Sequence, residues 1–160
     1  MTRLPYIYAI PVAVGMAALA GCGARGGSMR LINVPVANVR TQPGSLPESV
    51  EHDDQQETQL LYGERVRVLR AEQGWALVEA VEQPELTHHG RWEGYPGWVL
   101  LQQTQPVRSW REPNAVVRAK WATLWSDDRA SEPVLHVPIG TALHVTPTKG
   151  DLWRAELVGC

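Results

Sequence analysis

Residues 59–81 contain two runs of alternating apolar and polar side chains, separated by a short polar segment. In the first run Val66 and Val68 alternate with arginines, and in the second run the alternation resumes over residues 75–81. Alternation with a period of two is typical of a half-buried strand, and the polar segment Glu72-Gln73-Gly74 ends in a glycine that can turn the chain. The pattern therefore predicts a β-hairpin over residues 59–81.

The second run of this hairpin divides its side chains between two faces. Ala76 and Val78 share one face, and we expect them in the core, because small and β-branched residues suit the inside of a tightly curved barrel. Trp75 and Leu77 share the other face and are expected outside. There Trp75 either contributes to a contact surface or covers the open end of the barrel.

Short apolar stretches elsewhere in the first half of the chain predict further strands. Residues 34–40 and 98–100 have strand character, while residues 48–58 are polar and acidic and predict an exposed loop. Glycine and proline interrupt these segments, and no helical periodicity is present. This pattern predicts a small all-β barrel over residues 31–103.

The pattern is partly repeated in the second half of the chain, after a linker marked by Pro106 and Pro113. The repeated segments are residues 122–128, 140–145 and 152–157. They predict a second barrel over residues 108–160. Only seven residues follow Trp153, which leaves no run for a closing strand. This barrel is therefore expected to be incomplete and loosely ordered on its own, because one strand edge lacks a neighbour.

The amino terminus has the layout of an export signal. A short basic start precedes an apolar stretch from Leu4 to Ala20, and small residues lead into Cys22. We predict a signal peptide over residues 1–21 and a flexible tether over residues 22–30. The tetrapeptide Leu19-Ala20-Gly21-Cys22 resembles a bacterial lipobox, which implies cleavage before the cysteine and its lipidation. The alternative is an uncleaved anchor; both predict an exported, membrane-anchored chain that faces the periplasm or the cell exterior.

Charge and cysteine content exclude several classes of function. Fifteen basic and 17 acidic side chains nearly balance, and no basic patch stands out, so no nucleic-acid partner is expected. The two cysteines, Cys22 and Cys160, form neither a disulfide framework nor a metal-binding spacing. His88 and His89 would point to opposite sides of a strand, and no further ligands complete a site. We therefore expect neither a metal nor a cofactor.

A catalytic centre is not expected either. A nucleophilic cysteine needs a histidine base and usually a helix amino terminus, and the sequence offers Cys160 neither of them. No serine, histidine and aspartate set forms a recognisable triad. The chain is thus predicted not to be an enzyme.

Several segments together resemble a known family. They are Val36-Ala37-Asn38-Val39-Arg40, Gly63-Glu64-Arg65-Val66, Gly74-Trp75-Ala76-Leu77-Val78 and Gly97-Trp98-Val99, and they are similar to bacterial SH3-like domains. Gln83-Pro84, followed by a polar loop and by Gly94-Tyr95-Pro96-Gly97-Trp98-Val99, resembles the first SH3-like module of NlpC-type cell-wall peptidases of the dipeptidyl-peptidase VI kind. The resemblance covers residues 34–158 and implies two tandem SH3-like barrels.

The resemblance also implies a site and a partner. In that family two SH3-like modules precede a papain-like domain that cuts γ-D-glutamyl to diamino-acid bonds in peptidoglycan peptides. An aromatic residue of the first module helps to shape the substrate pocket, and Tyr95 is the matching position. Independently, Pro96 favours an extended backbone at Tyr95, which could project the phenol outward. The alternative is that Tyr95 packs locally on Trp98 or Trp92.

We therefore predict a ligand-binding aromatic surface made of Trp75, Tyr95 and Trp98. The expected function is that of a non-catalytic, cell-wall-binding and substrate-positioning part of an NlpC-type peptidase lipoprotein. Its expected partners are peptidoglycan peptides, a papain-like catalytic domain and, through the lipid on Cys22, a membrane. The alternative is a freestanding lipoprotein that binds wall peptides or a protein partner.

Overall fold

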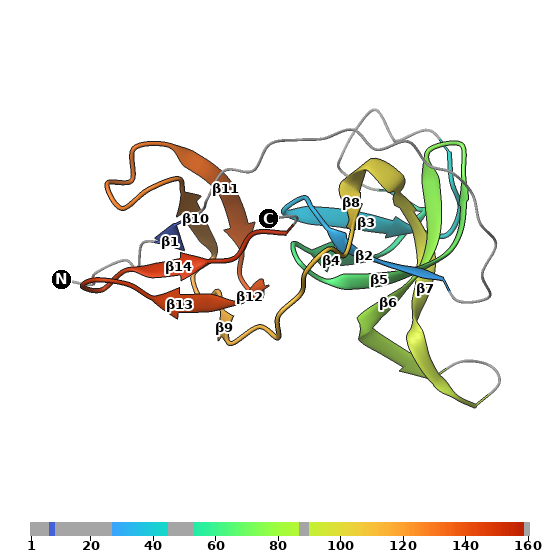
Figure 1. Ribbon diagram of the computed structural model, residues 1–160. Helices are drawn as coiled ribbons and strands as arrows, with labels where there is room; N and C mark the ends of the chain where they lie inside the picture. Colours follow the sequence, from blue (N-terminus) through green and yellow to red (C-terminus); the bar gives the residue numbers. More distant parts are fainter. Residues whose placement is uncertain (1–6, 9–26, 45–52, 87–89, 159–160) are drawn as a thin grey trace.

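The chain folds into two β-sheet modules that lie next to each other (Figure 1). The computed structural model describes residues 7–8, 27–44, 53–86 and 90–158. Apart from one short 3-10 turn, Leu101–Gln103, the regular elements in these ranges are all strands, which confirms the predicted all-β class. Within the same ranges no helix is long and apolar enough to span a bilayer.

The first module is one sheet of seven strands in the order β4-β3-β7-β6-β5-β2-β8. Its strands are β2 (Ser28–Ile32), β3 (Val36–Arg40), β4 (Gln56–Leu61), β5 (Arg65–Glu72), β6 (Trp75–Leu86), β7 (Trp92–Leu100) and β8 (Thr104–Pro106). Every pairing in this sheet is antiparallel. Strand β7 pairs with both β6 and β3 and so joins the two hairpins of the module.

The hairpin predicted over residues 59–81 is β5–β6. Glu72 pairs with Trp75, so the loop consists of only two residues, Gln73 and Gly74. Their φ angles are 47° and 82°, and a two-residue turn with two positive φ angles follows the right-handed twist of the flanking strands. The polar turn ending in glycine is therefore confirmed, together with the strands on both sides of it.

The core of the first module lies on the inner face of this hairpin. Ala76 and Val78 are fully buried, as predicted, and pack with Val39, Leu60, Val66 and Val99. Strand β7 comes close to β3 at Gly97, where an added Cβ would lie only 2.2 Å from a methyl group of Val39. A glycine is needed at this crossing because a side chain would displace the core.

The borders of several elements differ from the predicted ranges, and β7 begins at Trp92 rather than at residue 98. Strand β2 begins at Ser28, inside the range predicted for the tether, and it pairs with both β5 and β8. Strand β8 extends the first module to Pro106, beyond residue 103. Strand β4 begins at Gln56, within the range predicted as a loop. Each of these segments pairs with a strand distant in sequence, which local alternation does not reveal.

The second module has a five-stranded sheet in the order β11-β10-β1-β14-β13 and a two-stranded sheet of β12 and β9. Its strands are β9 (Ala115–Val116), β10 (Trp121–Trp125), β11 (Pro133–Pro138), β12 (Ala142–Leu143), β13 (Val145–Pro147) and β14 (Trp153–Ala155). Strand β1 (Ile7–Tyr8) lies between β10 and β14 and is parallel to both (Figure 1). The expectation that β14 lacks one neighbour is therefore wrong, because two residues of the amino-terminal segment occupy that position.

The core of the second module includes a residue from the first. Leu124, Val137, Leu143, Val145 and Ala155 are buried together, and Tyr62, which follows β4, belongs to the same cluster. The Tyr62 hydroxyl oxygen also accepts a hydrogen bond of 2.7 Å from the amide of Val158. The two modules thus share one packed contact at this side chain.

Candidate functional site

The structure does not bring the three predicted site residues to one surface. Leu77 pairs with Trp98 across β6 and β7, so Trp98 and Trp75 lie on the same face of the sheet. Tyr95 pairs with Ala80 and shares its side of β7 with Val99, which is the core side. Because successive side chains of a strand alternate between faces, Tyr95 lies opposite to the two tryptophans.

The two tryptophans are covered rather than open. Trp75 lies on the face opposite to Ala76 and Val78, as predicted, but it is only 7% exposed and Trp98 only 6%, so the expectation that Trp75 is open to a ligand is wrong. The guanidinium of Arg40 lies 5.7 Å from the centre of the Trp75 ring, and that of Arg70 lies 5.0 Å from the Trp98 ring. Cation–π contacts of this kind stabilise an aromatic ring that a strand presents to the outside.

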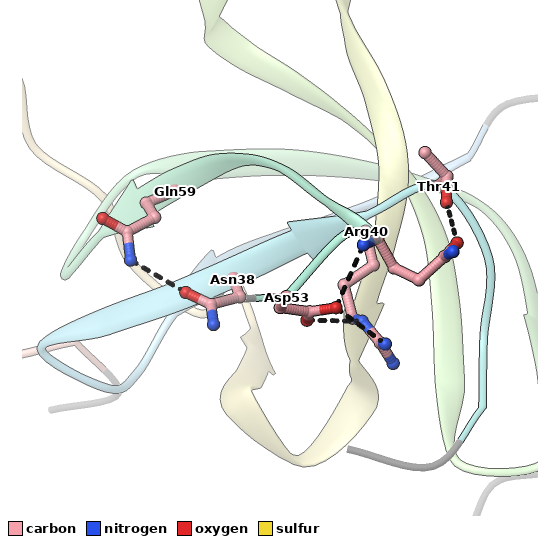
Figure 2. A network of polar contacts seen from close by, with 6 residues as sticks. Asn38, Arg40, Thr41, Asp53 and Gln59 are labelled. Carbon is pink, nitrogen blue, oxygen red and sulfur yellow. Dashed lines mark hydrogen bonds and ion pairs between the residues drawn. The ribbon is translucent and has the colours of Figure 1, made fainter. Parts of the chain in front are cut away.

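Arg40 is fixed in place by a charged partner. Its Nε lies 3.0 Å from Oδ2 of Asp53, and its Nη2 donates to the other carboxylate oxygen over 3.2 Å (Figure 2). Both side chains are largely buried. The guanidinium thus contacts both carboxylate oxygens, one through a hydrogen bond and one as an ion pair. Thr41 bonds to Gln55, and the Gln55 backbone amide donates to Asp53, so the pair that places Arg40 over Trp75 is part of a small polar network. Nearby on the same strands, the Gln59 side-chain amide donates to Asn38.

Tyr95 lies on the face of β7 opposite to Trp98, so it does not pack on Trp98 as one alternative to a pocket expected. Its ring packs against the core of the first module, and its hydroxyl donates a hydrogen bond of 2.8 Å to the carboxylate of Glu57. This hydrogen bond raises the pKa of Tyr95, because the carboxylate disfavours a phenolate next to it. A role for Tyr95 in binding remains a prediction.

A cleft lies between the two modules. Its volume is about 520 Å³, which lies within the usual range for small-ligand sites. The first module contributes Leu31, Tyr62 and Gly63, and the second contributes apolar groups from Leu143, Leu157 and Val158. The polar lining comes from the outer face of the β13–β14 hairpin, at His144, Thr146, Arg154 and Glu156.

The linker forms one wall of the cleft and is held from both sides. The Trp110 ring lies under the guanidinium of Arg65, 4.2 Å from the ring centre, which ties it to the first module. Arg111 pairs with Glu156 over 3.1 Å, and the Nδ1 of His144 lies 2.9 Å from the carbonyl oxygen of Glu112. These contacts hold Trp110 and the Arg111–Glu156 pair in the lining of the cleft.

Arg154 is the cationic side chain of the cleft that is available to bind a ligand. Among the described residues it has no ion-pair partner, whereas Arg111 is paired with Glu156. A free guanidinium beside apolar and aromatic walls suits a short peptide that carries a carboxylate. The sequence did not reveal this site, since Arg154 looked like an ordinary strand residue and Trp110 like part of a linker.

The histidine and cysteine side chains named above lie partly inside and partly outside the described residues. Within the described ranges, no group of three or more histidine, cysteine, aspartate or glutamate side chains is placed to hold a metal ion. His136 contacts the hydroxyl of Thr123 over 3.0 Å on the sheet surface. Cys22, Cys160, His88 and His89 lie outside the described residues.

Comparisons with known proteins agree with the resemblance to bacterial SH3-like domains that the sequence shows. The family profile of the bacterial dipeptidyl-peptidase SH3 domain matches residues 46–83. The crystal structure of an NlpC/P60 family protein from Bacillus cereus is similar, with a TM-score of 0.59 and 24% sequence identity over 76% of this chain. The match spans 48% of that protein, or about half of its length. No match was found among curated proteins.

These findings confirm the predicted SH3-like fold and its peptidase-associated type. The matched residues 46–83 include β4, β5 and most of β6. An SH3 domain is a binding fold and carries no catalytic centre of its own. The cleft is lined by apolar, aromatic and charged groups, whereas the two tryptophans are covered.

Proposed function

We propose that this chain is a non-catalytic part of an NlpC-type cell-wall peptidase and that it positions peptidoglycan peptides for a papain-like catalytic domain. The observation that carries the proposal is the match of residues 46–83 to the SH3 domain of bacterial dipeptidyl-peptidases. The similar Bacillus cereus structure supports it, because that protein is an NlpC/P60 family member of about twice the matched length.

The inter-module cleft is the proposed peptide site. Wall peptides carry free carboxylates, which the Arg154 guanidinium can bind through charge-assisted hydrogen bonds. The Trp110 ring and the leucine side chains of the cleft can cover the aliphatic part of a diamino acid. The linker contacts hold these groups in place before a ligand arrives, which lowers the entropic cost of binding.

Titration with a γ-D-glutamyl-diaminopimelate peptide, followed by NMR shifts and calorimetry, tests this site. Arg154→Gln should weaken binding by about tenfold, equal to about 1.4 kcal/mol. Arg118→Gln is the matched control, because Arg118 is exposed and does not line the cleft. Absence of binding at millimolar peptide, or equal effects of the two variants, would contradict the proposal.

A second pair of variants asks whether the first module contributes its aromatic residue. Tyr95→Phe keeps the ring and removes the bond to Glu57, while Tyr95→Ala removes both. If Tyr95 touches the peptide, Tyr95→Ala weakens binding more than Tyr95→Phe at equal stability. Turnover of the peptide by the chain, surviving Cys160→Ala, would argue against a non-catalytic role.

The proposed location is the outer side of a bacterial membrane, with a lipid on Cys22. The support is the apolar stretch that ends in Leu19-Ala20-Gly21-Cys22. Mass spectrometry of the membrane fraction should find an acylated amino-terminal Cys22, and Cys22→Ser should release the chain or leave it unprocessed. A soluble chain that retains Met1 would exclude this location.

A further inference from the structure

The edge hairpins of the two modules have the same register. Strands β3 and β4 pair at one edge of the first sheet, and β10 and β11 pair in the same way at one edge of the second. In both hairpins four pairs follow without interruption, and one extra residue on the second strand separates the fifth pair from them. Three residues of β10 therefore correspond position by position to three of β3: Trp121 to Val36, Thr123 to Asn38 and Trp125 to Arg40.

These three residues of β10 lie on the outer face of the second module. Leu124 is fully buried in the core, and Ala122 packs against the same cluster. Because side chains alternate along a strand, Trp121, Thr123 and Trp125 point away from that core. Trp121 is 53% exposed, and Trp125 is half-buried.

The centre of this face is a polar pair in both modules. In the first module the Gln59 amide donates to Asn38, and in the second the Thr123 hydroxyl lies 3.0 Å from Nδ1 of His136. His136 is exposed, and within the part of the chain that the structure describes its other ring nitrogen, Nε2, has no hydrogen-bond partner. An imidazole nitrogen donates or accepts a hydrogen bond according to its tautomer, so this pair can bind a polar ligand group.

The flanks of the face differ between the modules. In the first module Arg40 is buried in its pair with Asp53, so the module's own residues occupy that flank. In the second module Trp125 stands at the matching position, and Trp121 stands at the other flank. The two tryptophans are four residues apart, or about 13 Å along the strand. Two indole rings thus flank the polar pair of the second module only.

The residues opposite the two tryptophans keep the face free of acidic and strongly basic groups. Pro138 pairs with Trp121, and Pro133 pairs with Trp125. Together with the central pair these are six side chains, and none of them carries a carboxylate, an ammonium or a guanidinium. Such a face suits a neutral ligand with hydroxyl groups. The C–H groups of a sugar ring are attracted to the negative face of an indole, and its polar groups can bond to the pair between the rings.

We propose that the outer face of the β10–β11 hairpin binds the glycan strand of the cell wall, a neutral chain of N-acetylated amino sugars. Trp121 and Trp125 would stack on sugar rings of one chain, and Thr123 and His136 would bind the acetamide or hydroxyl groups between them. The choice of a wall glycan rests on the proposed association with peptidoglycan. It does not require peptide binding in the cleft.

The probe is the tetramer of β-1,4-linked N-acetylglucosamine, titrated into the full chain in detergent and followed by NMR. The chain has seven tryptophans and hence seven indole N–H groups, and Trp121→Phe and Trp125→Phe assign two of the signals. The sugar should shift these two signals and leave the others in place. The peptide used to test the cleft contains no sugar, so the two sites succeed or fail separately.

Trp121→Ala should weaken binding of the tetramer by about tenfold or more, because an aromatic anchor is lost. Trp121→Tyr keeps an aromatic ring and should retain most of the affinity. Trp92→Ala is the matched control, since Trp92 is 71% exposed and belongs to β7 of the first module. Slow hydrogen exchange at Leu124 shows that the second module of a variant is folded, and the shifts of the unchanged chain decide where a variant is not.

Three results would overturn the proposal. The first is an unchanged Trp121 signal at millimolar tetramer. The second is an equal loss of affinity in Trp121→Ala and Trp92→Ala, which would place the sugar elsewhere. The third is equal affinity for the tetramer of glucosamine, which carries an ammonium in place of each acetamide, because the face would then not recognise the neutral sugar.

Discussion

The two modules share an order of strands but differ in what completes them. The first module closes with β7, a long strand from its own sequence, over a core drawn from its own residues. The second is closed by a two-residue strand from the far end of the chain, and its core includes Tyr62 of the first module. The same architecture is thus self-sufficient in one copy and dependent in the other.

This difference shows where the stability of each module originates. In the first, the long β6–β7 pairing and the Arg40–Asp53 pair act within one contiguous segment. In the second, contacts with the first module and with the amino terminus replace interactions that the local sequence does not supply. Changes at the shared contacts should therefore separate the two modules experimentally.

The largest effect is expected from Tyr62→Ala. Losing a buried aromatic side chain costs about 3–5 kcal/mol, and this ring packs in the core of the second module. Hydrogen exchange should become much faster around Leu124 and Val137, with little change around Val78. Tyr62→Phe loses only the bond to Val158 and should cost about 1 kcal/mol. Equal loss of protection in both modules would contradict this dependence.

A smaller effect, in the opposite module, is expected from Asp53→Asn. This change removes the charge that faces the buried Arg40 guanidinium and should lower the free energy of unfolding of the first module by about 2–3 kcal/mol. The fluorescence of Trp75 should also change as Arg40 becomes mobile. Glu79→Gln breaks the exposed pair with Arg67 and should cost less than about 1 kcal/mol. If both variants lowered the free energy of unfolding by similar amounts, burial of the Arg40–Asp53 pair would add nothing to stability.

The smallest effect concerns the pH dependence at Glu64. Burial raises the pKa of Glu64, so the folded chain binds this proton more tightly than the unfolded chain. Stability should therefore fall as the pH rises from the ordinary glutamate value of about 4.3 through the higher folded value, and then level off. Glu64→Gln should flatten this part of the curve, measured by urea unfolding. Glu132→Gln, at an exposed residue of the second module, should leave the curve unchanged.

The local features of the fold were accessible from the sequence. Alternation and the glycine at position 74 predicted β5–β6 and its turn, because both depend on neighbouring residues. The same alternation assigned Ala76 and Val78 to the core. It also assigned Trp75 to the outer face, but it could not show that Arg40 covers this ring, since the covering residue belongs to another strand.

The features that depend on contacts between distant residues could not be predicted from the sequence. The cleft requires Trp110 to stack under Arg65 and Arg111 to reach Glu156, and no periodicity connects these positions. The pairing of β1 with β10 and β14 joins opposite ends of the chain. The grouping of Tyr95 with Trp98 was wrong for a different reason, because residues three apart in one strand point to opposite faces, and the strand predicted over residues 98–100 did not extend back to Tyr95.

The hydrogen bond between the Val158 amide and the Tyr62 hydroxyl joins residues 96 positions apart. A chain that emerges from a ribosome or a membrane pore delivers the first module in full before β14 appears. During that interval the Tyr62 ring has no core to enter and remains in contact with water. The assembly of the whole chain should therefore be sequential, with a finished first module acting as the template on which the second condenses, and the interval gives folding factors a defined aromatic group to recognise.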